Sequence, residues 1–292
     1  MTAEHFGRLR RPHEGDKGHA VTQLPDWVPP HIDMTVPSIA RMYDYMLGGG
    51  HNFAADRDVV KRGELVEPGL RRIARLNRSF LRRAVLFMVD QGIRQFLDIG
   101  SGVPTVGQVH EIAQKAVPEC RVLYVDRDAI AVAHSELILA GTDHVGVLHA
   151  DMRNPEAILD SDEARRLLDF DEPIGLLFLL MLHWVPDEDD PHRLLATYRD
   201  ALVSGSHLAI THATDDRQPQ MMDGMVDTMH RTRSPDQARP RSYDEVHAMF
   251  GDFELVEPGL VGCGTWRPGG PGDIAEDAKY NEFVYAGVAR KS

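Results

Sequence analysis

The sequence predicts an α/β protein built on a mostly parallel sheet, and three observations support this fold class. Short apolar runs alternate with amphipathic helical segments from about residue 94 onward. The apolar run 96–99 leads into the glycine turn 100–102, and a second apolar run ends on the acid Asp126. The composition, 42% hydrophobic and 26% charged, is that of an ordinary globular protein. Alternating strands and helices predict a parallel sheet covered by helices on both faces.

The predicted elements follow one another in a regular order. Strands are expected near 94–99, 121–126, 145–149, 174–181 and 206–211. The helices between them are expected near 105–117, 128–140, 155–169 and 191–203. A capping box, Ser242 with Glu245, then opens a further helix. Strands near 252–257 and 282–289 follow without a helix between them, which predicts an antiparallel hairpin at the sheet edge.

The region before residue 93 has a different pattern. Residues 1–33 are rich in His, Arg, Gly and Pro and show no periodicity, so we expect a flexible arm. Apolar residues at helical spacing predict a helix that stops at the glycines 48–50. Asn52 is expected to cap a short helix over 56–61, and a long helix is expected over 68–91. The predicted organisation is an arm (1–33), a helical cap (34–92) and a ligand-binding domain (93–292).

Charge and composition exclude several classes of protein. The net charge of −13 argues against a general nucleic-acid binder. Two cysteines, Cys120 and Cys263, are too few for a disulfide framework or a Cys-rich zinc site. His110-Glu111 lacks the second histidine of a zincin motif, because Gln114 stands there, so no metal is expected. We find no membrane span or secretory signal and expect a cytoplasmic protein.

The glycine turn and the acid after the next strand predict a nucleoside site. Such a turn lets the backbone approach a ligand, and Asp126 would accept hydrogen bonds from ribose hydroxyls. The third glycine of the dinucleotide fingerprint is absent, because Pro104 and Thr105 follow, which weakens the case for NAD. S-adenosylmethionine (SAM) has a nucleoside and no phosphates. Asp151 would accept from its adenine amino group, and Met152 would pack on the ring.

Several motifs resemble a known group of proteins. DIGSG, YVDRD, HADMR and LHWVPD, in this order, resemble class I SAM-dependent methyltransferases. The stretch PSIARMYDYMLGGGHNFAADR, with LVEPGL and YAGVAR, resembles one bacterial S-adenosyl methyltransferase family of unassigned substrate, formerly a domain of unknown function. The resemblance covers about residues 33–290. It implies a Rossmann-like fold with a seven-stranded, mostly parallel sheet, an antiparallel C-terminal hairpin and an N-terminal helical cap.

The same resemblance assigns cofactor contacts to matching positions of this sequence. It implies that Gly100, Ser101 and Gly102 line the methionine and ribose portion and that Asp98 helps to hold the amino group. The remaining implied contacts are Asp126 with the ribose, Arg127 beside the adenine, Asp151 and Met152 around the base, and the backbone of Leu180.

The polar residues of the cap suggest a lid over the cofactor. Arg41 could bind the methionine carboxylate, and Tyr43 and Asn52 could complete the pocket. The alternative is that Tyr43 packs in the apolar stripe of its helix and that Asn52 only caps the next one. Methionines 221, 222, 225 and 229 fall at helical spacing, which predicts packing in the core or lid, or else an adaptable substrate wall.

We therefore predict methyl transfer from SAM to a small-molecule nucleophile, with S-adenosylhomocysteine (SAH) as the product. His183, just past the fourth strand, is the first candidate for a general base, and His51 is the second; Asp44 is a further option. The rival functions are a non-catalytic SAM-binding regulator and, less favoured, an NAD-dependent oxidoreductase. The long helix 68–91 would permit a homodimer.

Overall fold

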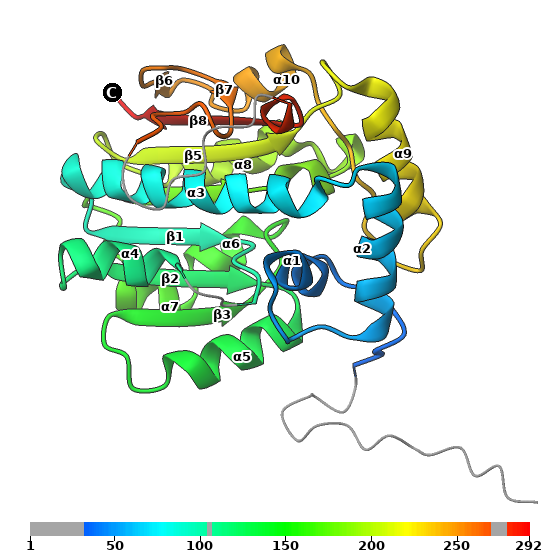
Figure 1. The fold of residues 1–292 in the computed structure, drawn as a ribbon. Coiled ribbons are helices and arrows are strands. Elements are labelled where there is room, and N and C mark those ends of the chain that lie inside the picture. Colours follow the sequence, from blue (N-terminus) through cyan, green and yellow to red (C-terminus); the bar gives the residue numbers. More distant parts are fainter. Residues whose placement is uncertain (1–31, 104–106, 270–278) are drawn as a thin grey trace, which may run out of the picture.

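The protein's structure, a computed structural model, describes residues 32–103, 107–269 and 279–292. These ranges form one sheet of eight strands in the order β3-β2-β1-β4-β5-β8-β6, with β7 also paired to β8 (Figure 1). The strands β1 to β5 pair in parallel, and β8 runs antiparallel to β5. The strands are β1 (Gln95–Ile99), β2 (Arg121–Asp126), β3 (Val145–His149), β4 (Gly175–Leu179), β5 (His207–Ala213), β6 (Glu254–Leu255), β7 (Val261–Gly262) and β8 (Val284–Arg290).

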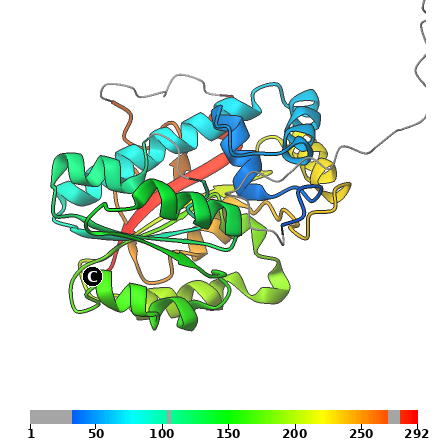
Figure 2. The ribbon, with the colours of Figure 1, turned by 90° about the horizontal axis from the view of Figure 1, so that it is seen from below.

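Helices cover both faces of this sheet (Figure 2). On one face lie α3 (Leu70–Asp90), α4 (Val109–Ala116) and α5 (Ala129–Leu139). On the other lie α6 (Pro155–Leu159), α7 (Asp162–Leu167), α8 (Pro191–Asp200) and α10 (Tyr243–Ala248). The predicted α/β fold, with its antiparallel C-terminal hairpin, is confirmed.

The strands bury side chains on both faces, as parallel strands covered by helices must. In β1, Phe96 packs into the core beneath α3 and α4, while Leu97 and Ile99 pack into the core beneath α6, α7 and α8. The next strand alternates in the same way, with Tyr124 on the first side and Val125 on the second. This alternation explains the near-continuous apolar runs that predicted the strands.

Three details differ from the predicted elements. The helix expected over 155–169 is two short helices, because the Ser161 hydroxyl accepts from the Ala164 N–H and begins α7. The outermost strand is split into β6 and β7, which pair with separate parts of β8. Asn52 does not cap the helix after the three glycines: Phe53 stands at the N-cap, and its N–H donates to Asp56.

Three further helices lie where the parallel strands end, on the right of Figure 1: α1 (Ile39–Leu47), α2 (Ala54–Val66) and α9 (Pro219–His230). The contact between α2 and α9 is close at one position. A Cβ on Gly224 would lie 2.8 Å from the Val66 side chain. These helices, with the adjoining end of α3, form a layer over the carboxyl edge of the sheet. The predicted arm (1–33) lies, apart from its last residues, outside the described residues.

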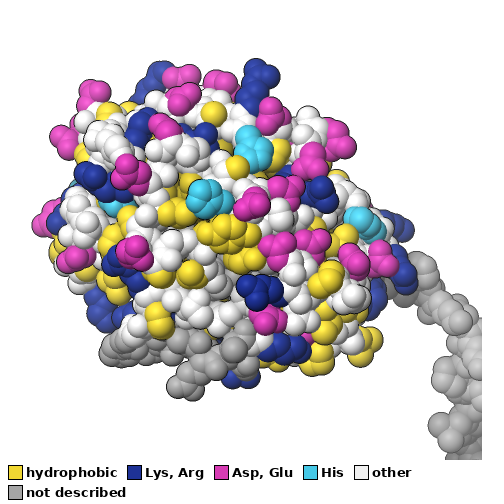
Figure 3. All heavy atoms as spheres, turned by 90° about the horizontal axis from the view of Figure 1, so that it is seen from above, with side chains coloured by type: hydrophobic (Ala, Val, Ile, Leu, Met, Phe, Trp, Pro, Cys, Tyr) yellow, Lys and Arg dark blue, Asp and Glu magenta, His cyan; other side chains and the backbone are white. Residues whose placement is uncertain are grey.

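The surface mixes both signs of charge. On the face seen in Figure 3, acidic and basic side chains are interspersed rather than gathered into a basic area. Among the described residues, no helix has both the length and the apolar character needed to cross a membrane.

Candidate functional site

A cavity of about 610 Å³ lies between the carboxyl ends of the strands and the helical layer. This volume falls in the usual range of small-molecule sites, about 300–1,000 Å³. The predicted site residues that line it are Arg41, Tyr43, Asp98, Gly100, Ser101, Gly102, Asp126, Arg127, Met152, Leu180 and His183. The predicted residues outside the lining are His51, Asn52 and Asp151.

The glycine turn after β1 forms one wall of the cavity. Gly100 has φ +74°, and a Cβ there would overlap the Met181 side chain, so only glycine fits without displacing that side chain. The Gly102 N–H donates to Asp126 Oδ2 over 2.7 Å, and the Asp128 N–H donates to Asp126 Oδ1 over 2.8 Å. Asp126 therefore holds the ends of β1 and β2 together while it faces the cavity.

Two buried carboxyl groups with raised pKa values, Asp98 and Asp126, lie at this end of the cavity. Burial raises the pKa of Asp98 to about 7; nearby Arg78 opposes this rise, and Asp126 adds to it. Burial also raises the pKa of Asp126 to about 6, against the hydrogen bonds from the Asp128 and Gly102 backbones. Their ionised forms would be stabilised by a nearby cation or by hydrogen-bond donors, which would replace the hydration lost on burial.

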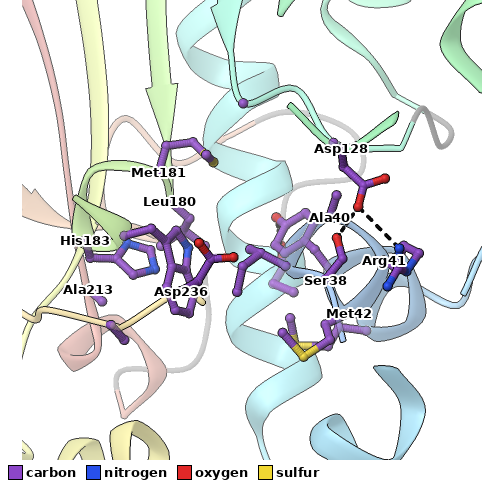
Figure 4. Close-up of a pocket in the computed structure, with 18 of the residues that line it drawn as sticks. Ser38, Ala40, Arg41, Met42, Asp128, Leu180, Met181, His183, Ala213 and Asp236 are labelled. Carbon is purple, nitrogen blue, oxygen red and sulfur yellow. Dashed lines mark hydrogen bonds and ion pairs between the residues drawn. The ribbon is translucent and has the colours of Figure 1, made fainter. Parts of the chain in front are cut away.

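Arg41 lines the cavity, but other residues of the chain already hold its guanidinium. Its Nε donates to Asp56 over 2.9 Å, Nη2 donates to the Val36 carbonyl, and Nη1 lies 3.5 Å from Asp128 (Figure 4). Both Arg41 and Asp56 are buried. This arrangement ties α1 to the start of α2. The expected contact of Arg41 with a methionine carboxylate would have to compete with these partners.

Arg78, on α3, has fewer partners than Arg41. It lines the cavity, and its Nη2 donates to the Gly107 carbonyl over 3.1 Å. In the part of the chain that the structure describes, it forms no ion pair, although it lowers the pKa of both Asp98 and Tyr43 through its charge. Nothing in the sequence separates Arg78 from its neighbouring arginines, because all of them fit a solvated helix face.

A network of charges closes the side of the cavity beyond β2. Arg127 pairs with Asp236, from the loop after α9, and its Nη1 lies 3.7 Å from Asp151. Asp151 is itself held by Arg153, with Nη2 2.6 Å away. Asp236 lines the cavity, whereas Asp151 supports two lining arginines from outside. No feature of the sequence indicated the partnership of Asp236 with Arg127.

His183 lies in the short 3₁₀ helix η1 (Leu182–Trp184), after β4. Its side chain lines the cavity (Figure 4). The side chain is buried, and its Nδ1 has no hydrogen-bond partner among the described residues. Burial, with the nearby His212 and Arg241, holds the pKa of His183 well below its usual range. The ring is therefore neutral at pH 7.

The backbone on both sides of His183 is fixed by one buried arginine. Arg241 donates to the carbonyls of Leu182 and Val185 over 3.0 and 2.9 Å, and its Nη2 lies 2.7 Å from Asp187. The backbone N–H of Arg239 also donates to the His183 carbonyl over 2.7 Å. The imidazole is thus held in place through its main chain, which leaves the ring itself to face the cavity.

The second candidate base is placed elsewhere. The His51 N–H and the Asn52 amide both donate to Asp44 Oδ2, over 2.9 and 2.8 Å. The His51 ring packs on His134 of α5, with 3.9 Å between ring centroids. Because His51, Asn52 and Asp44 all lie outside the lining, they organise the glycine loop of the cap and do not face the cavity.

Tyr43 connects the cap to the sheet through a chain of hydrogen bonds. Its hydroxyl donates to the Ala74 carbonyl over 3.1 Å and accepts from the Asn77 amide over 2.9 Å. Asn77 Oδ1 accepts from the Thr211 hydroxyl, and Thr211 Oγ1 accepts from the Leu180 N–H over 2.8 Å. Leu180 has φ +56°, a strained value for a residue other than glycine. The chain of bonds holds this strained residue at the cavity wall.

Comparisons with known proteins identify the class. The S-adenosyl methyltransferase family matches residues 25–292, and the chain belongs to this family of enzymes, whose cofactor is SAM. A candidate methyltransferase from Thermobifida fusca YX has 39% identity and a TM-score of 0.85, covering 92% of this chain and 100% of its own. A DUF574 family protein from Streptomyces avermitilis MA-4680 has 36% identity and a TM-score of 0.84, covering 89% and 99%. No curated protein matches the sequence.

The residues present fit SAM. The glycine turn leaves the backbone open to the cavity, and Asp126 offers a carboxylate at the end of β2. The two raised carboxyl pKa values show buried acids that a cationic amino acid would stabilise. The methionine part of SAM carries an ammonium and a carboxylate on the same carbon. Asp98 and the nearby Arg78 offer one group of the opposite charge for each.

Proposed function

We propose that the protein transfers a methyl group from SAM to a small-molecule nucleophile. SAM would bind at the glycine turn, and the acceptor would enter from the helical layer. When bound, SAM supplies a methyl group on a sulfonium, so the acceptor forms a bond to that methyl as the carbon–sulfur bond breaks and SAH forms. The observation that carries the proposal is the placement of Asp98, Asp126 and His183 in one cavity.

The polar residues divide the contacts with the cofactor among them. Asp126 would accept from the ribose hydroxyls, and Asp98 would hold the methionine ammonium. Arg78, in place of Arg41, would bind the methionine carboxylate, because its guanidinium has a carbonyl partner only. Arg127 and Met152 would flank the adenine, with Asp151 fixing Arg127 from behind.

His183 would act on the acceptor. Its neutral ring can accept a hydrogen bond from a hydroxyl or amine, which orients the nucleophile. A buried imidazole of low pKa is a weak base. The acceptor atom, however, gains positive charge as its new bond forms, and its proton then becomes acidic enough for this base to take. The hydrogen bonds from Arg241 to the Leu182 and Val185 carbonyls would keep the ring at this position.

The decisive experiment is isothermal titration of SAM into the wild type and two matched variants, Asp126→Asn and Asp143→Asn. The loss of hydrogen bonds to a charged, buried group predicts about 100-fold weaker binding for Asp126→Asn. Asp143→Asn, at an exposed position outside the cavity lining, should change the affinity by no more than about threefold. Equal affinities for all three proteins would rule out the proposed site, and so would an absence of SAM binding to the wild type.

A further inference from the structure

The half of the cavity beneath the helical layer is lined by apolar side chains. We define this apolar compartment by six lining residues from four elements: Met42 and Met46 of α1, Val60 of α2, Met225 and Met229 of α9, and Trp184 of η1. Met42, Val60 and Met229 are nearly fully buried, at 5%, 3% and 9% exposure.

Five of these six residues, all but Met225, belong to or pack against a small cluster that is distinct from the two clusters that fill the faces of the sheet. Met42, Val60 and Met229 belong to this third cluster, and Met46 and Trp184 pack against it. The buried members of the cluster come from α1, α2 and α9, which are helices outside the sheet. The cluster therefore does not support the sheet directly. Its side chains surround the space that an acceptor would enter.

The type of side chain indicates the shape of the ligand. Four of the six residues are methionines, whose flexible thioethers adapt to a flat surface and make favourable contacts with aromatic rings. Trp184 offers an aromatic face or edge to the same space. Such walls fit a ring system better than a branched or highly hydrated molecule.

Charge excludes anionic acceptors from this compartment. The arginines among the described lining residues are Arg41, Arg78, Arg127 and Arg153, and none belongs to the six residues of the compartment. Three of them are held in ion pairs. Arg78 lies near Asp98, in the part of the cavity formed by the glycine turn and Asp126, which we call the cofactor end. A carboxylate or phosphate placed among the methionines would lose its water and gain no cation in return.

We propose that the methyl acceptor is an uncharged aromatic small molecule whose hydroxyl or N–H nucleophile faces His183 while its ring lies in the apolar compartment. This inference rests on the proposed function. The nucleophile's lone pair would form the bond to the methyl carbon as the carbon–sulfur bond breaks. The proton passes to His183 and then to water, and SAH leaves as the neutral thioether. His183 is the polar group of this arrangement because it borders the compartment through its neighbour Trp184.

The test uses two fluorescent probes that share their rings and differ in charge. N-phenyl-1-naphthylamine is neutral, and 1-anilinonaphthalene-8-sulfonate carries one negative charge; both emit more strongly in an apolar site. Each is titrated into the full-length protein saturated with SAH, which fills the cofactor end. We expect the neutral probe to bind about tenfold or more tightly than the sulfonate, because the compartment offers the sulfonate no cation.

Variants place the probe in the compartment. Met225→Glu adds a charge to a half-buried lining position of α9 and should weaken binding of the neutral probe about tenfold or more. Gln220→Glu adds the same charge to an exposed position of the same helix and should leave the affinity unchanged. Met225→Gln, which adds no charge, serves as a second variant if Met225→Glu unfolds, and it should weaken binding about threefold.

Titration of SAH separates this inference from the proposed function. If SAH binds normally and the sulfonate binds as tightly as the neutral probe, the inference is wrong and the proposed function stands. The same conclusion follows if Met225→Glu and Met225→Gln both leave the binding of the neutral probe unchanged. If SAH itself does not bind to the wild type, the proposed function fails. Selective binding of the neutral probe that is lost in Met225→Glu supports the inference.

Discussion

The two ends of the cavity are built in different ways. The cofactor end consists of short segments that follow β1, β2, β3 and β4, and its polar groups sit where these strands end or, for Arg78, on α3. The apolar compartment consists of helix faces from α1, α2 and α9, with the short η1 helix. One end is charged and tied to the sheet, whereas the other is apolar and formed by the helical layer. Under the proposed function, cofactor binding and acceptor choice would therefore depend on separate parts of the chain.

Arg41 belongs to the helical layer, and its replacement should have the largest effect on stability. Arg41→Met leaves the buried Asp56 and the nearby Asp128 without their cation. Breaking a buried pair costs about 3–5 kcal/mol, which lowers Tm by roughly 10 °C. Thermal unfolding measures this loss, and Arg62→Met, at an exposed position of α2, is the control. If Tm stayed constant while SAM affinity fell, Arg41 would be the carboxylate ligand after all.

Arg78 should show the opposite pattern. Arg78→Met removes a cation that has no carboxylate partner among the described residues, so folding should change little. Its loss should weaken SAM binding about 30-fold, since a charge-assisted hydrogen bond to a carboxylate contributes about 2 kcal/mol. Arg75→Met, at an exposed position one turn away on the same helix, is the matched control for titration calorimetry. Equal affinities for the two variants would remove Arg78 from the site.

The pH dependence of SAM binding tests the charge at the cofactor end. Asp98, with its pKa raised to about 7, must ionise to hold a cation, so affinity should fall about tenfold between pH 8 and pH 6. Titrations at both pH values measure this, and Asp98→Asn should bind weakly at both.

The stability of the ligand-free protein should change with pH in the opposite direction, decreasing from pH 6 to pH 8. A raised pKa stabilises the fold below the pKa of the unfolded chain, and this contribution is lost as pH rises through 7. A Tm that rises from pH 6 to pH 8 in the wild type relative to Asp98→Asn would contradict this assignment.

The smallest effect is expected in the chain of hydrogen bonds that joins Tyr43 to Leu180. Thr211→Val removes the hydroxyl that links Asn77 to the Leu180 N–H. The Leu180 N–H keeps a second bond, to the Thr211 carbonyl over 3.0 Å, so the loss should be only about 1 kcal/mol. Denaturant unfolding measures it, and Thr211→Ser should restore most of the stability. A loss in Thr211→Ser as large as in Thr211→Val would show that packing of the methyl group matters more than the hydrogen bonds.

The sequence predicted the sheet well because its signals are local. The runs that became β2 and β3 were placed at their observed bounds, since an apolar stretch followed by an acid or a turn marks a buried strand. The division of 155–169 into two helices depended on a hydrogen bond by Ser161 that periodicity does not register. The split of the outer strand into β6 and β7 likewise arose from its pairing with β8.

In the candidate site too, features with a local sequence signal were predicted, and features that depend on tertiary contacts were not. Eleven of the predicted residues line the cavity. Nine of them lie in the glycine turn or at the ends of parallel strands, which meet at one edge of the sheet, and the other two, Arg41 and Tyr43, come from α1. His51 and Asn52 do not line it, because the buried Asp44 draws both into the glycine loop. The partnerships of Arg127 with Asp236 and of Arg241 with the backbone around His183 join segments far apart in the chain.

By itself, the sequence determined the α/β fold and the carboxyl edge at which the cavity lies, and it predicted a nucleoside site there, because each depends on spacing within a few dozen residues. Only the tertiary structure decided which charged groups remain for a ligand. Arg41 and Arg78 are equivalent as residue types, but burial against Asp56 and Asp128 engages the first, while the second stays beside the cavity with a carbonyl partner. Electrostatic partners are chosen by distance in space, and a sequence records only distance along the chain.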